Sequence, residues 1–457
     1  MNPKDNSFYY PSVNSSFVFS DAFEMPDFIN YGKFRASWGK VGNFPVPYQA
    51  NIAYTQSSLG DQGDGSVIYT TLPLAAGNDG IKSETKRDAE FGLELKMFNG
   101  RMGIDMAYYD SRLQDQILPL TLPNSAGANS VLTNIGTMRN KGFEIAFTTT
   151  PVAGKDFTWD ANINFAFNKN TVESLAPGLE ELVHANYDGS AAKLVSQPGE
   201  PVGVFYTHPV ATDANGNKIV DPNGLYKVDA DEWIKVGSAQ PKFIGGFSNF
   251  FTYKNFTLSA LVDFRVGGYV MPTGINWMTS RGLTEESLKY MDAEHGGLSW
   301  FENSVTGNRE LIAEGTAQGP NGETVYDNGI VLDGVKADGT ENDYITSNPE
   351  YYNTVYNWGG PQYSPNTRYE LYIKENTYFK MRELSLAYQL PSTIVKKIGF
   401  QDLQLSVFGR NLFYFYRTIK DMDAEQLTAG SRWFQNVNSA GMNPSSRTFG
   451  LSLRAKL

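Results

Sequence analysis

The stretch "FTWDANINFAFNKN", residues 157–170, alternates between two kinds of side chain over its first eleven residues. One side of the alternation is apolar and mainly aromatic: Phe157, Trp159, Ala161, Ile163, Phe165 and Phe167. The other side is mainly polar: Thr158, Asp160, Asn162, Asn164 and Ala166. Because successive side chains of a strand point to opposite faces, the stretch predicts a strand with an apolar and a polar face. It fits a half-buried strand of a soluble sandwich, or a barrel strand that crosses a membrane in about 9–11 residues.

The same alternation recurs along the chain, often around tight turns. The runs "AEFGLELKMF" (89–98) and "RMGIDMAYYDS" (101–111) flank Asn99-Gly100, a strong hairpin signal. The runs "KFIGGFSNFFTY" (242–253) and "FTLSALVDFRV" (256–266) flank Lys254-Asn255. A shift of the apolar phase between Met381 and Leu384 predicts a β-bulge. "STIVKKIG" (392–399) predicts one short helical turn, and no other amphipathic helix is expected.

The connections between the runs alternate between tight turns and long stretches. The long ones are rich in Gly, Asn, Asp, Pro and Tyr and cover roughly residues 43–85, 117–135, 171–241, 269–374 and 417–445. Loops beyond about 15 residues are uncommon in soluble domains. An outer-membrane barrel, by contrast, has short periplasmic turns and long extracellular loops. The alternation therefore favours an all-β fold, a transmembrane antiparallel up-and-down barrel, over a soluble sandwich.

Composition excludes several classes of protein and of site. The 457 residues contain no Cys, which excludes disulfides, thiolate metal sites and Cys nucleophiles. A net charge of −11 argues against nucleic acid as a partner. The three histidines, His184, His208 and His295, lie too far apart in the chain to suggest a metal or catalytic cluster. The sequence contains no run of 18 apolar residues, which excludes a helical membrane protein.

The number of alternating runs predicts eleven strands. Bacterial single-chain barrels have an even number, and an open strand edge in lipid leaves backbone groups unpaired at a cost of several kcal/mol each. The N-terminal "MNPKDNSFYYPSV" also lacks the basic and apolar regions of a signal peptide. We therefore expect residues 1–457 to be the C-terminal part of a larger barrel.

Several blocks, in order along nearly the whole chain, resemble the C-terminal barrel half of SusC-type (SusC/RagA) TonB-dependent transporters of Bacteroidetes outer membranes. "FYYPSVNSSFVFSD" (8–21) and "KFRASWGKVGN" (33–43) are similar to the family's Phe-Pro-Ser strand and the strand after it. "NIGTMRNKGFEI" (134–145) matches the family's Asn-Xaa-Gly-Xaa-Met-Xaa-Asn-Lys-Gly block closely. The remaining matching blocks are the hairpin at residues 84–118, "YFKMRELSLAYQLP", "FGRNLF" and "SSRTFGLSL".

The resemblance implies a 22-stranded barrel, of which eleven strands are half, in the cell outer membrane. It implies a plug domain inside the barrel, absent from this chain, through which TonB–ExbB–ExbD would act. It also implies a SusD-like lipoprotein lid and import of nutrient oligomers, either glycan or peptide. A siderophore-type receptor without a lid, and a non-transporting surface glycan-binding or adhesion protein, remain the alternatives.

Aromatic residues in the long connections are candidate substrate contacts, because such rings stack on sugars and bury apolar peptide side chains. Packing within the loops or contact with the lid is the alternative for these residues. The candidates are Trp277, Trp300, Tyr351, Tyr352 and Trp358. Polar residues expected to face the lumen are Asp160, Asn162, Asn164, Asp263 and Arg265.

Two loops have acidic residues at spacings that invite comparison with calcium sites. "DANGNKIVDPNG" (213–224) lacks the Gly and Glu that an EF-hand needs at its sixth and twelfth places, which favours a polar turn. "GVKADGTENDY" offers Asp338, Glu341 and Asp343, but a solvated loop is the stronger interpretation. No spacing of Asp, Glu or Ser indicates a catalytic group, and the G-x-S-x-G elbow is missing. We therefore expect neither a cofactor nor an enzyme.

Overall fold

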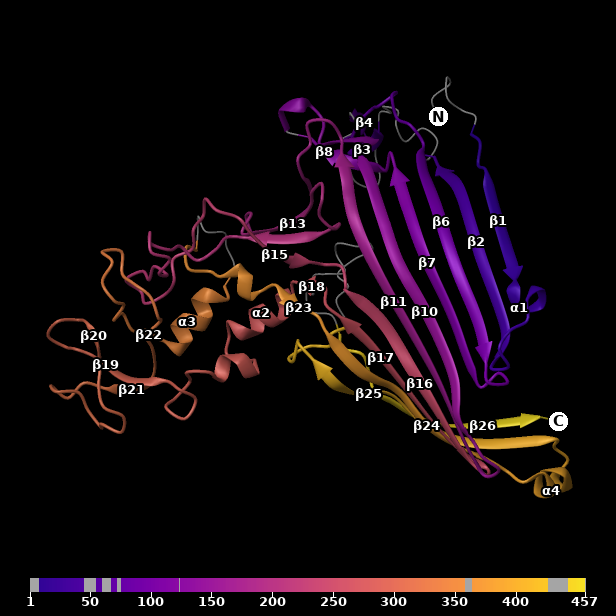
Figure 1. Cartoon of the computed structure of the whole chain (residues 1–457). Coiled ribbons are helices and arrows are strands. Elements are labelled where there is room, and N and C mark those ends of the chain that lie inside the picture. The colour runs from indigo at the N-terminus through magenta and orange to yellow at the C-terminus, as the bar shows by residue number, and fades with distance from the viewer. Residues whose placement is uncertain are drawn as a thin grey trace. The chain divides into compact units, whose positions relative to one another are not determined.

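A large antiparallel sheet organises the molecule (Figure 1). The computed structural model describes residues 8–44, 55–59, 67–71, 75–122, 124–357, 364–425 and 443–456. The sheet has eleven strands in the order β1-β2-β6-β7-β10-β11-β16-β17-β24-β25-β26. They are β1 (Ser12–Val18), β2 (Ile29–Asn43), β6 (Glu84–Met97), β7 (Met102–Gln114), β10 (Gly136–Ala153), β11 (Phe157–Leu175), β16 (Phe243–Tyr253), β17 (Phe256–Val266), β24 (Tyr378–Gln389), β25 (Asp402–Arg417) and β26 (Thr448–Lys456). The predicted number of strands and all-β class are confirmed.

The shorter strands belong to the long connections. They are β3 (Thr55–Leu59), β4 (Val67–Thr71), β5 (Ala75–Ala76), β8 (Ile117–Thr121), β9 (Ser130–Asn134), β12 (Leu182–Tyr187), β13 (Ala192–Ser196), β14 (Val204–Thr207), β15 (Ile234–Ser238), β18 (Tyr269–Val270), β19 (Leu298–Glu302), β20 (Arg309–Leu311), β21 (Val325–Ile330), β22 (Thr346–Ser347) and β23 (Lys374–Glu375). The connections within residues 43–85, 117–135, 171–241 and 269–374 are therefore long, as expected, and they contain small sheets.

Four short α-helices occur among the described residues: α1 (Phe19–Ala22), α2 (Thr273–Thr279), α3 (Asn348–Val355) and α4 (Ser392–Val395). Single 3-10 turns lie at Asn124–Ala126, Glu285–Leu288, Tyr369–Leu371 and Lys396–Ile398. The helical turn predicted in "STIVKKIG" is confirmed as α4. The sequence indicated no other amphipathic helix, and the three further helices, α1, α2 and α3, have four, seven and eight residues, too few for an amphipathic period to show. Within the described ranges, no helix has the length and apolarity needed to cross a bilayer.

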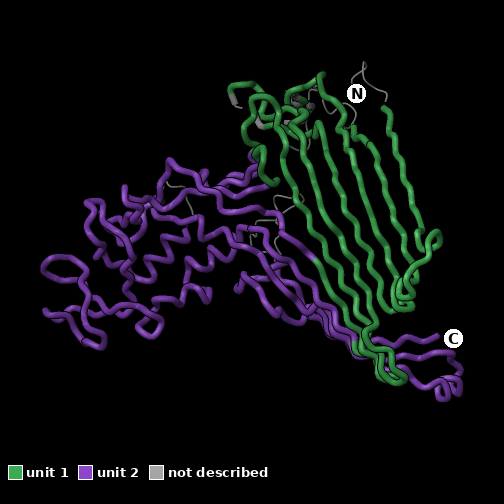
Figure 2. The backbone as a smooth tube through the Cα atoms, in the orientation of Figure 1, with its two compact units in different colours: residues 1–182, 197–202, 245–258 green, residues 183–196, 203–244, 259–457 purple. Residues whose placement is uncertain are grey.

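The chain divides into two compact units, drawn in green and purple in Figure 2. The first comprises residues 1–182, 197–202 and 245–258, and its long strands lie side by side. Strand register places like side chains in rows across this unit. Phe34 lies opposite Leu93, Leu93 opposite Met106, and Met106 opposite Ile145. Ile145 in turn lies opposite Phe165 of β11, the strand of the opening stretch.

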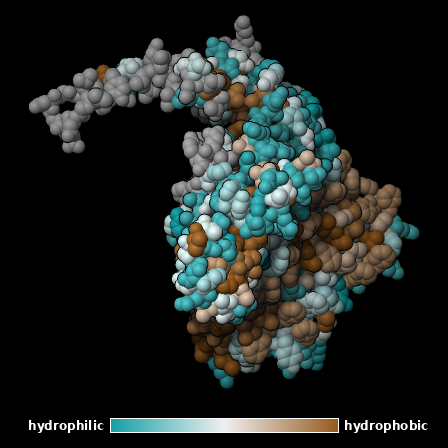
Figure 3. Space-filling view, turned by 90° about the vertical axis from the view of Figure 1, so that its left-hand side faces the viewer, coloured by the Kyte–Doolittle hydropathy of each residue, from teal (hydrophilic) through white to brown (hydrophobic). Residues whose placement is uncertain are grey.

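The apolar face of the first unit is exposed. Phe34, Phe91, Phe143, Ile163 and Phe167 are all exposed, with Phe143 at 50%. A contiguous exposed apolar surface of this kind needs a partner, and in a barrel wall the partner is lipid. In Figure 3, hydrophobic residues gather in the lower part of the view and hydrophilic residues in the upper part.

A turn and a bulge agree with the sequence. Asn99 and Gly100 have φ of 57° and 78°, the left-handed conformation that a tight hairpin turn needs. The register of β24 and β25 shifts between Met381 and Glu383, which confirms the predicted bulge. The bulge changes which side chains of β24 share a face, with consequences for Lys380 and Arg382 below.

The second unit, residues 183–196, 203–244 and 259–457, has its own core among the loops. Tyr352 and Val355 of α3, and Tyr356 directly after it, pack with Ile275 of α2 and Phe205 of β14. Tyr356 and Tyr372 stack nearly parallel, with ring centroids 5.6 Å apart. A buried apolar core makes these connections a folded layer, which can hold clefts of defined shape.

Candidate functional site

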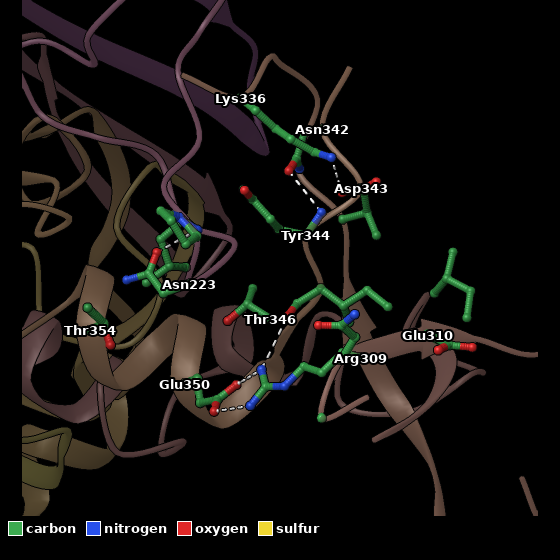
Figure 4. Close-up of a pocket in the computed structure, with 17 residues that line it drawn as sticks. Asn223, Arg309, Glu310, Lys336, Asn342, Asp343, Tyr344, Thr346, Glu350 and Thr354 are labelled. Atoms are coloured by element: carbon green, nitrogen blue, oxygen red, sulfur yellow. Dashed lines mark hydrogen bonds and ion pairs between the residues drawn. The ribbon is translucent and has the colours of Figure 1, made fainter. Parts of the chain in front are cut away.

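A cleft in the described part of the second unit has a volume of about 1190 Å³. Its wall combines Asn223, the strand β20 that carries Arg309, residues 342–346, and Glu350 and Thr354 of α3 (Figure 4). Ligand pockets commonly measure about 300–1,000 Å³, so this cleft has room for an oligomer segment. We call it the Arg309 cleft.

Charges in the Arg309 cleft are paired with one another. The Arg309 guanidinium donates two hydrogen bonds to the Glu350 carboxylate, at 2.5 and 2.6 Å, and a third to the Ile345 carbonyl. These contacts, chiefly the Arg309 hydrogen bond, lower the pKa of Glu350 to about 2. Lys336 pairs with Asp343 at 2.6 Å. The cleft therefore presents fixed dipoles and amide groups more than free charge, which suits a neutral or mixed-charge polar ligand.

The second cleft, of about 900 Å³, is lined by Trp277 and Met278 of α2 and by Phe413 and Tyr414 of β25. Four basic residues also line it: Lys380, Arg417, Lys420 and Arg447. Trp277 is 44% exposed, and the Arg281 guanidinium lies 5.2 Å from its ring centroid. An exposed ring beside cationic side chains offers both a stacking surface and hydrogen-bond donors. We call this the Trp277 cleft.

A charge network lies beside the Trp277 cleft. Lys380, only 2% exposed, donates a 2.5 Å hydrogen bond to Glu425, and its ammonium lies 4.8 Å from the Tyr414 ring centroid. Arg382 donates to Glu425 and, at 2.5 Å, to Asp263 on β17. Buried charges of this kind are stable only when paired and hydrogen-bonded. The network therefore ties β17 and β24 to the segment that follows β25.

The structure separates the candidate aromatic residues into two groups. Trp300 is 6% exposed, stacks on Tyr326 and donates to Asn328, and Tyr352 is 4% exposed in the loop core. Both rings are thus buried by packing within the loops, Tyr351 packs against the same core, and contact with substrate stays a prediction for all three. Trp277 is exposed in a cleft, and its contact with substrate stays a prediction. The fifth candidate, Trp358, lies outside the described residues.

The residues expected to face the lumen lie on polar faces with varied partners. Asp160 accepts a 2.6 Å hydrogen bond from the Thr150 hydroxyl, while Asn162 and Asn164 are exposed. Asp263 belongs to the charge network, and Arg265 donates to the carbonyls of Gly267 and Ala239. Two of the five thus make contacts that hold the second unit together, and lumen lining stays a prediction for the set.

The loops compared with calcium sites use their acidic groups locally. Asp213 accepts from the backbone of Asn215 and Asn217 and from the Asn217 amide, as a polar turn does. Asp338 accepts from Thr340, and Asp343 pairs with Lys336. In the part of the chain that the structure describes, no three His, Asp or Glu residues are grouped to hold a metal ion. The clefts can therefore bind by hydrogen bonds, stacking and charge.

The charged network was missed by sequence reasoning. Lys380, Arg382 and Glu425 come from β24 and from the segment after β25, 45 and 43 residues apart for the two pairs with Glu425. The one signal was the phase shift in residues 378–388, which brings basic residues to an unexpected face.

Comparison with known proteins identifies relatives along the chain. A family model described as TonB dependent receptor-like, beta-barrel matches residues 2–289. TonB-dependent receptor P3 of Formosa agariphila is 26% identical over 455 residues, covering 93% of this chain and 39% of that protein. TonB-dependent receptor SusC of Bacteroides thetaiotaomicron is 27% identical over 257 residues, covering 52% of this chain and 25% of that protein.

A solved structure, the RagAB peptide transporter, has a similar fold. Its TM-score is 0.66 at 18% identity, and the match covers 98% of this chain and 43% of the matched chain. The chain thus spans less than half the length of the relatives and of the structure that it matches.

Proposed function

Because the chain belongs to the TonB dependent receptor-like β-barrel family, we propose that it serves in the import of nutrient oligomers, glycan or peptide, across the outer membrane. It supplies wall strands and capture loops of a SusC-like transporter and carries out no covalent chemistry. Residues 1–457 form the C-terminal part of the barrel in this proposal. The relatives are named as receptors and a transporter, which supports this function over an enzymatic one.

One observation carries the proposal: an eleven-stranded sheet with an exposed apolar face has tight turns at one end and long, folded connections at the other. Lipid covers the apolar face, and the folded connections face outward to the medium. The two clefts lie in those connections, where an incoming oligomer arrives first. Their size and mixed polarity suit a flexible polar chain better than a compact apolar ligand.

The proposal includes partners that complete a transport cycle. A SusD-like lipoprotein would close over the capture loops. A plug domain would fill the barrel, and TonB–ExbB–ExbD would act on the plug to open a path. The polar face of the strands, including Asn162 and Asn164, would then border the plug.

Uptake measurements test the proposal through Trp277. Cells that carry this sequence in its native gene are grown on mixed glycan or peptide oligomers, and oligomer uptake is measured. Trp277→Ala removes the exposed ring of the Trp277 cleft, so uptake of one oligomer class should fall roughly tenfold or more, as for loss of a stacking contact of about 1–3 kcal/mol. Leu283→Ala is the matched control, since Leu283 is 67% exposed in the same connection and does not line the cleft.

Two results would overturn the proposal, and a third would exclude the Trp277 cleft as the capture site. Uptake of an iron chelate without uptake of either oligomer class would indicate a siderophore-type receptor. Extraction of the protein without detergent would indicate a surface protein that never enters the membrane. Equal oligomer uptake by both variants would remove the Trp277 cleft as the capture site.

A further inference from the structure

Four basic residues lie directly opposite one another across four neighbouring strands of the first unit. Lys40 on β2 lies opposite Arg87 on β6. Arg87 lies opposite Arg112 on β7, and Arg112 opposite Arg139 on β10. Strands lie about 4.8 Å apart, so the four positions span about 15 Å. We call these four residues the basic row.

The basic row lies on the apolar face, at the end of the strands that leads into the long connections. Arg87 and Phe91 on β6, like Arg139 and Phe143 on β10, are separated by an even number of residues and share a face. The four-residue step is about 13 Å along a strand, or about 10 Å in height at the usual barrel tilt. Phe143 lies 4.9 Å from Tyr108, centroid to centroid, as in an interfacial aromatic girdle. The basic row is thus at the level of lipid headgroups.

Two more cations extend the row. Lys141 on β10 lies opposite Lys169 on β11, one step nearer the aromatic residues. Like charges directly opposite each other destabilise a sheet. The strands nevertheless bring six cations to one outward face, which calls for a source of negative charge.

Acidic residues on this face neutralise only part of that charge. Arg139 pairs with Asp110 at 2.5 Å, and Arg112 pairs with Glu173 at 2.5 Å. Lys141 lies 3.6 Å from the same Asp110. The remaining cations, Lys40, Arg87 and Lys169, form no ion pair with any residue in the described ranges. Six cations against two carboxylates leave this face strongly positive.

We infer that the basic row, with Lys141 and Lys169, binds the phosphorylated headgroup of an outer-leaflet lipid. Phosphate offers acceptor oxygens that a guanidinium can hold with two hydrogen bonds, and it carries the charge that this face lacks. The acyl chains of the same lipid would lie against the exposed rings of Phe91 and Phe143 below. Basic residues beside a membrane surface recognise anionic headgroups in this way. This site is independent of the cargo that the loops capture.

A charge-matched pair of triple variants tests the inference. Lys40→Gln/Arg87→Gln/Lys169→Gln removes the three unpaired cations and leaves the ion pairs of Asp110 and Glu173 intact. Lys86→Gln/Lys96→Gln/Lys155→Gln removes the same charge elsewhere, since Lys86 and Lys96 lie on the opposite face of β6 and Lys155 in the turn between β10 and β11. Protein extracted from outer membranes in non-ionic detergent is titrated with phosphorylated lipid A, dephosphorylated lipid A or inorganic phosphate, and native mass spectrometry counts bound molecules.

Phosphorylated lipid A should bind the unchanged protein and the control triple variant equally. A cation near a lipid surface contributes about fivefold in affinity, so Arg87→Gln should weaken binding of phosphorylated lipid A about fivefold. The triple variant that lacks Lys40, Arg87 and Lys169 should bind it on the order of a hundredfold more weakly. Equal loss in both triple variants would overturn the inference, as would equal binding of dephosphorylated lipid A. Inorganic phosphate that binds as tightly as the lipid would indicate a phosphate-ion site instead. Identical gel mobility shifts on heating confirm that every variant is folded.

Discussion

Arg35 on β2 forms a two-pronged ion pair with Asp105 on β7, across the intervening strand β6. Its Nη2 lies 2.5 Å from Oδ1 and its Nη1 lies 3.2 Å from Oδ2 of Asp105. The side chain passes over Gly92, where a Cβ atom would lie 2.3 Å from the Arg35 Nε. Because Gly92 has no side chain, Arg35 on β2 can cross β6 and form an ion pair with Asp105 on β7.

Gly92→Ala should displace Arg35 and break its pair with Asp105. Because both side chains are partly exposed, the cost in free energy of unfolding should be about 1–2 kcal/mol. Urea unfolding in detergent measures it. In a double-mutant cycle, Gly92→Ala should cost little once Arg35→Ala is present. Additive costs would show that the close approach to Arg35 is not the cause.

Ile163→Arg places a charge in the middle of the apolar face. Ile163 is 43% exposed in the first unit and lies opposite Phe147. A charge at the lipid midplane costs about 2–4 kcal/mol in barrel proteins. Refolding into lipid vesicles measures the change, with Asn164→Arg on the polar face as the control. Equal tolerance of both variants would contradict the assignment of the apolar face to lipid.

Lys380→Met should destabilise the second unit by about 1–3 kcal/mol, because it leaves the partly buried Glu425 carboxylate with Arg382 as its remaining cationic partner. Lys380 is 2% exposed and lies 3.9 Å from Asp423 as well as 2.5 Å from Glu425. Lys420→Met is the matched control. The Lys420 and Glu285 side chains are 65% and 66% exposed, so that pair is worth no more than about 1 kcal/mol. Thermal unfolding followed by tryptophan fluorescence separates the two outcomes.

Acidification should loosen the loop sheet that contains β12 and β13. Burial lowers the pKa of His184 to about 4, while its Nε2 lies 2.7 Å from the Ser196 hydroxyl. An unfolded chain has a histidine pKa near 6.5, so it binds a proton that the folded sheet does not as pH falls from about 6.5 to about 4. The stabilisation by neutral His184 is therefore complete above about pH 6.5 and is lost through that window.

Hydrogen exchange of β12 at a series of pH values measures this loss, and His184→Gln should abolish the dependence. His295 provides a contrast, because its hydrogen bond with Asp292 raises its pKa. Its contribution is present below about pH 6.5 and is lost as pH rises through the raised pKa. His295→Gln should therefore leave the acid response of β12 unchanged. A response that persists in His184→Gln would assign it to other groups.

The sheet could be predicted from sequence because alternation is a local property. A two-residue period repeats in the runs around Asn99-Gly100 and in residues 157–170, and backbone geometry alone turns that period into two faces. The long connections were visible for the same reason, as stretches in which the period stops. Helices α2 and α3 were not visible, because seven and eight residues hold too few turns for a helical period to emerge.

The candidate site was predictable only in part. Composition identified aromatic residues in the loops, but it could not separate buried Trp300 and Tyr352 from exposed Trp277. That difference depends on which segments fold against each ring, and the contacts come from distant parts of the chain. The pairing of Lys380 and Arg382 with Glu425 has the same origin.

The sequence by itself determined the strands, their two faces and the ends at which the connections are long, because each follows from neighbouring residues. Only the tertiary structure decided which charges meet. Arg35 reaches Asp105 over Gly92, and Lys40 meets Arg87, Arg112 and Arg139, because strand register brings residues far apart in the chain to one level. Register is set by pairing across the whole sheet, and a shift of one residue would send each of those side chains to the opposite face.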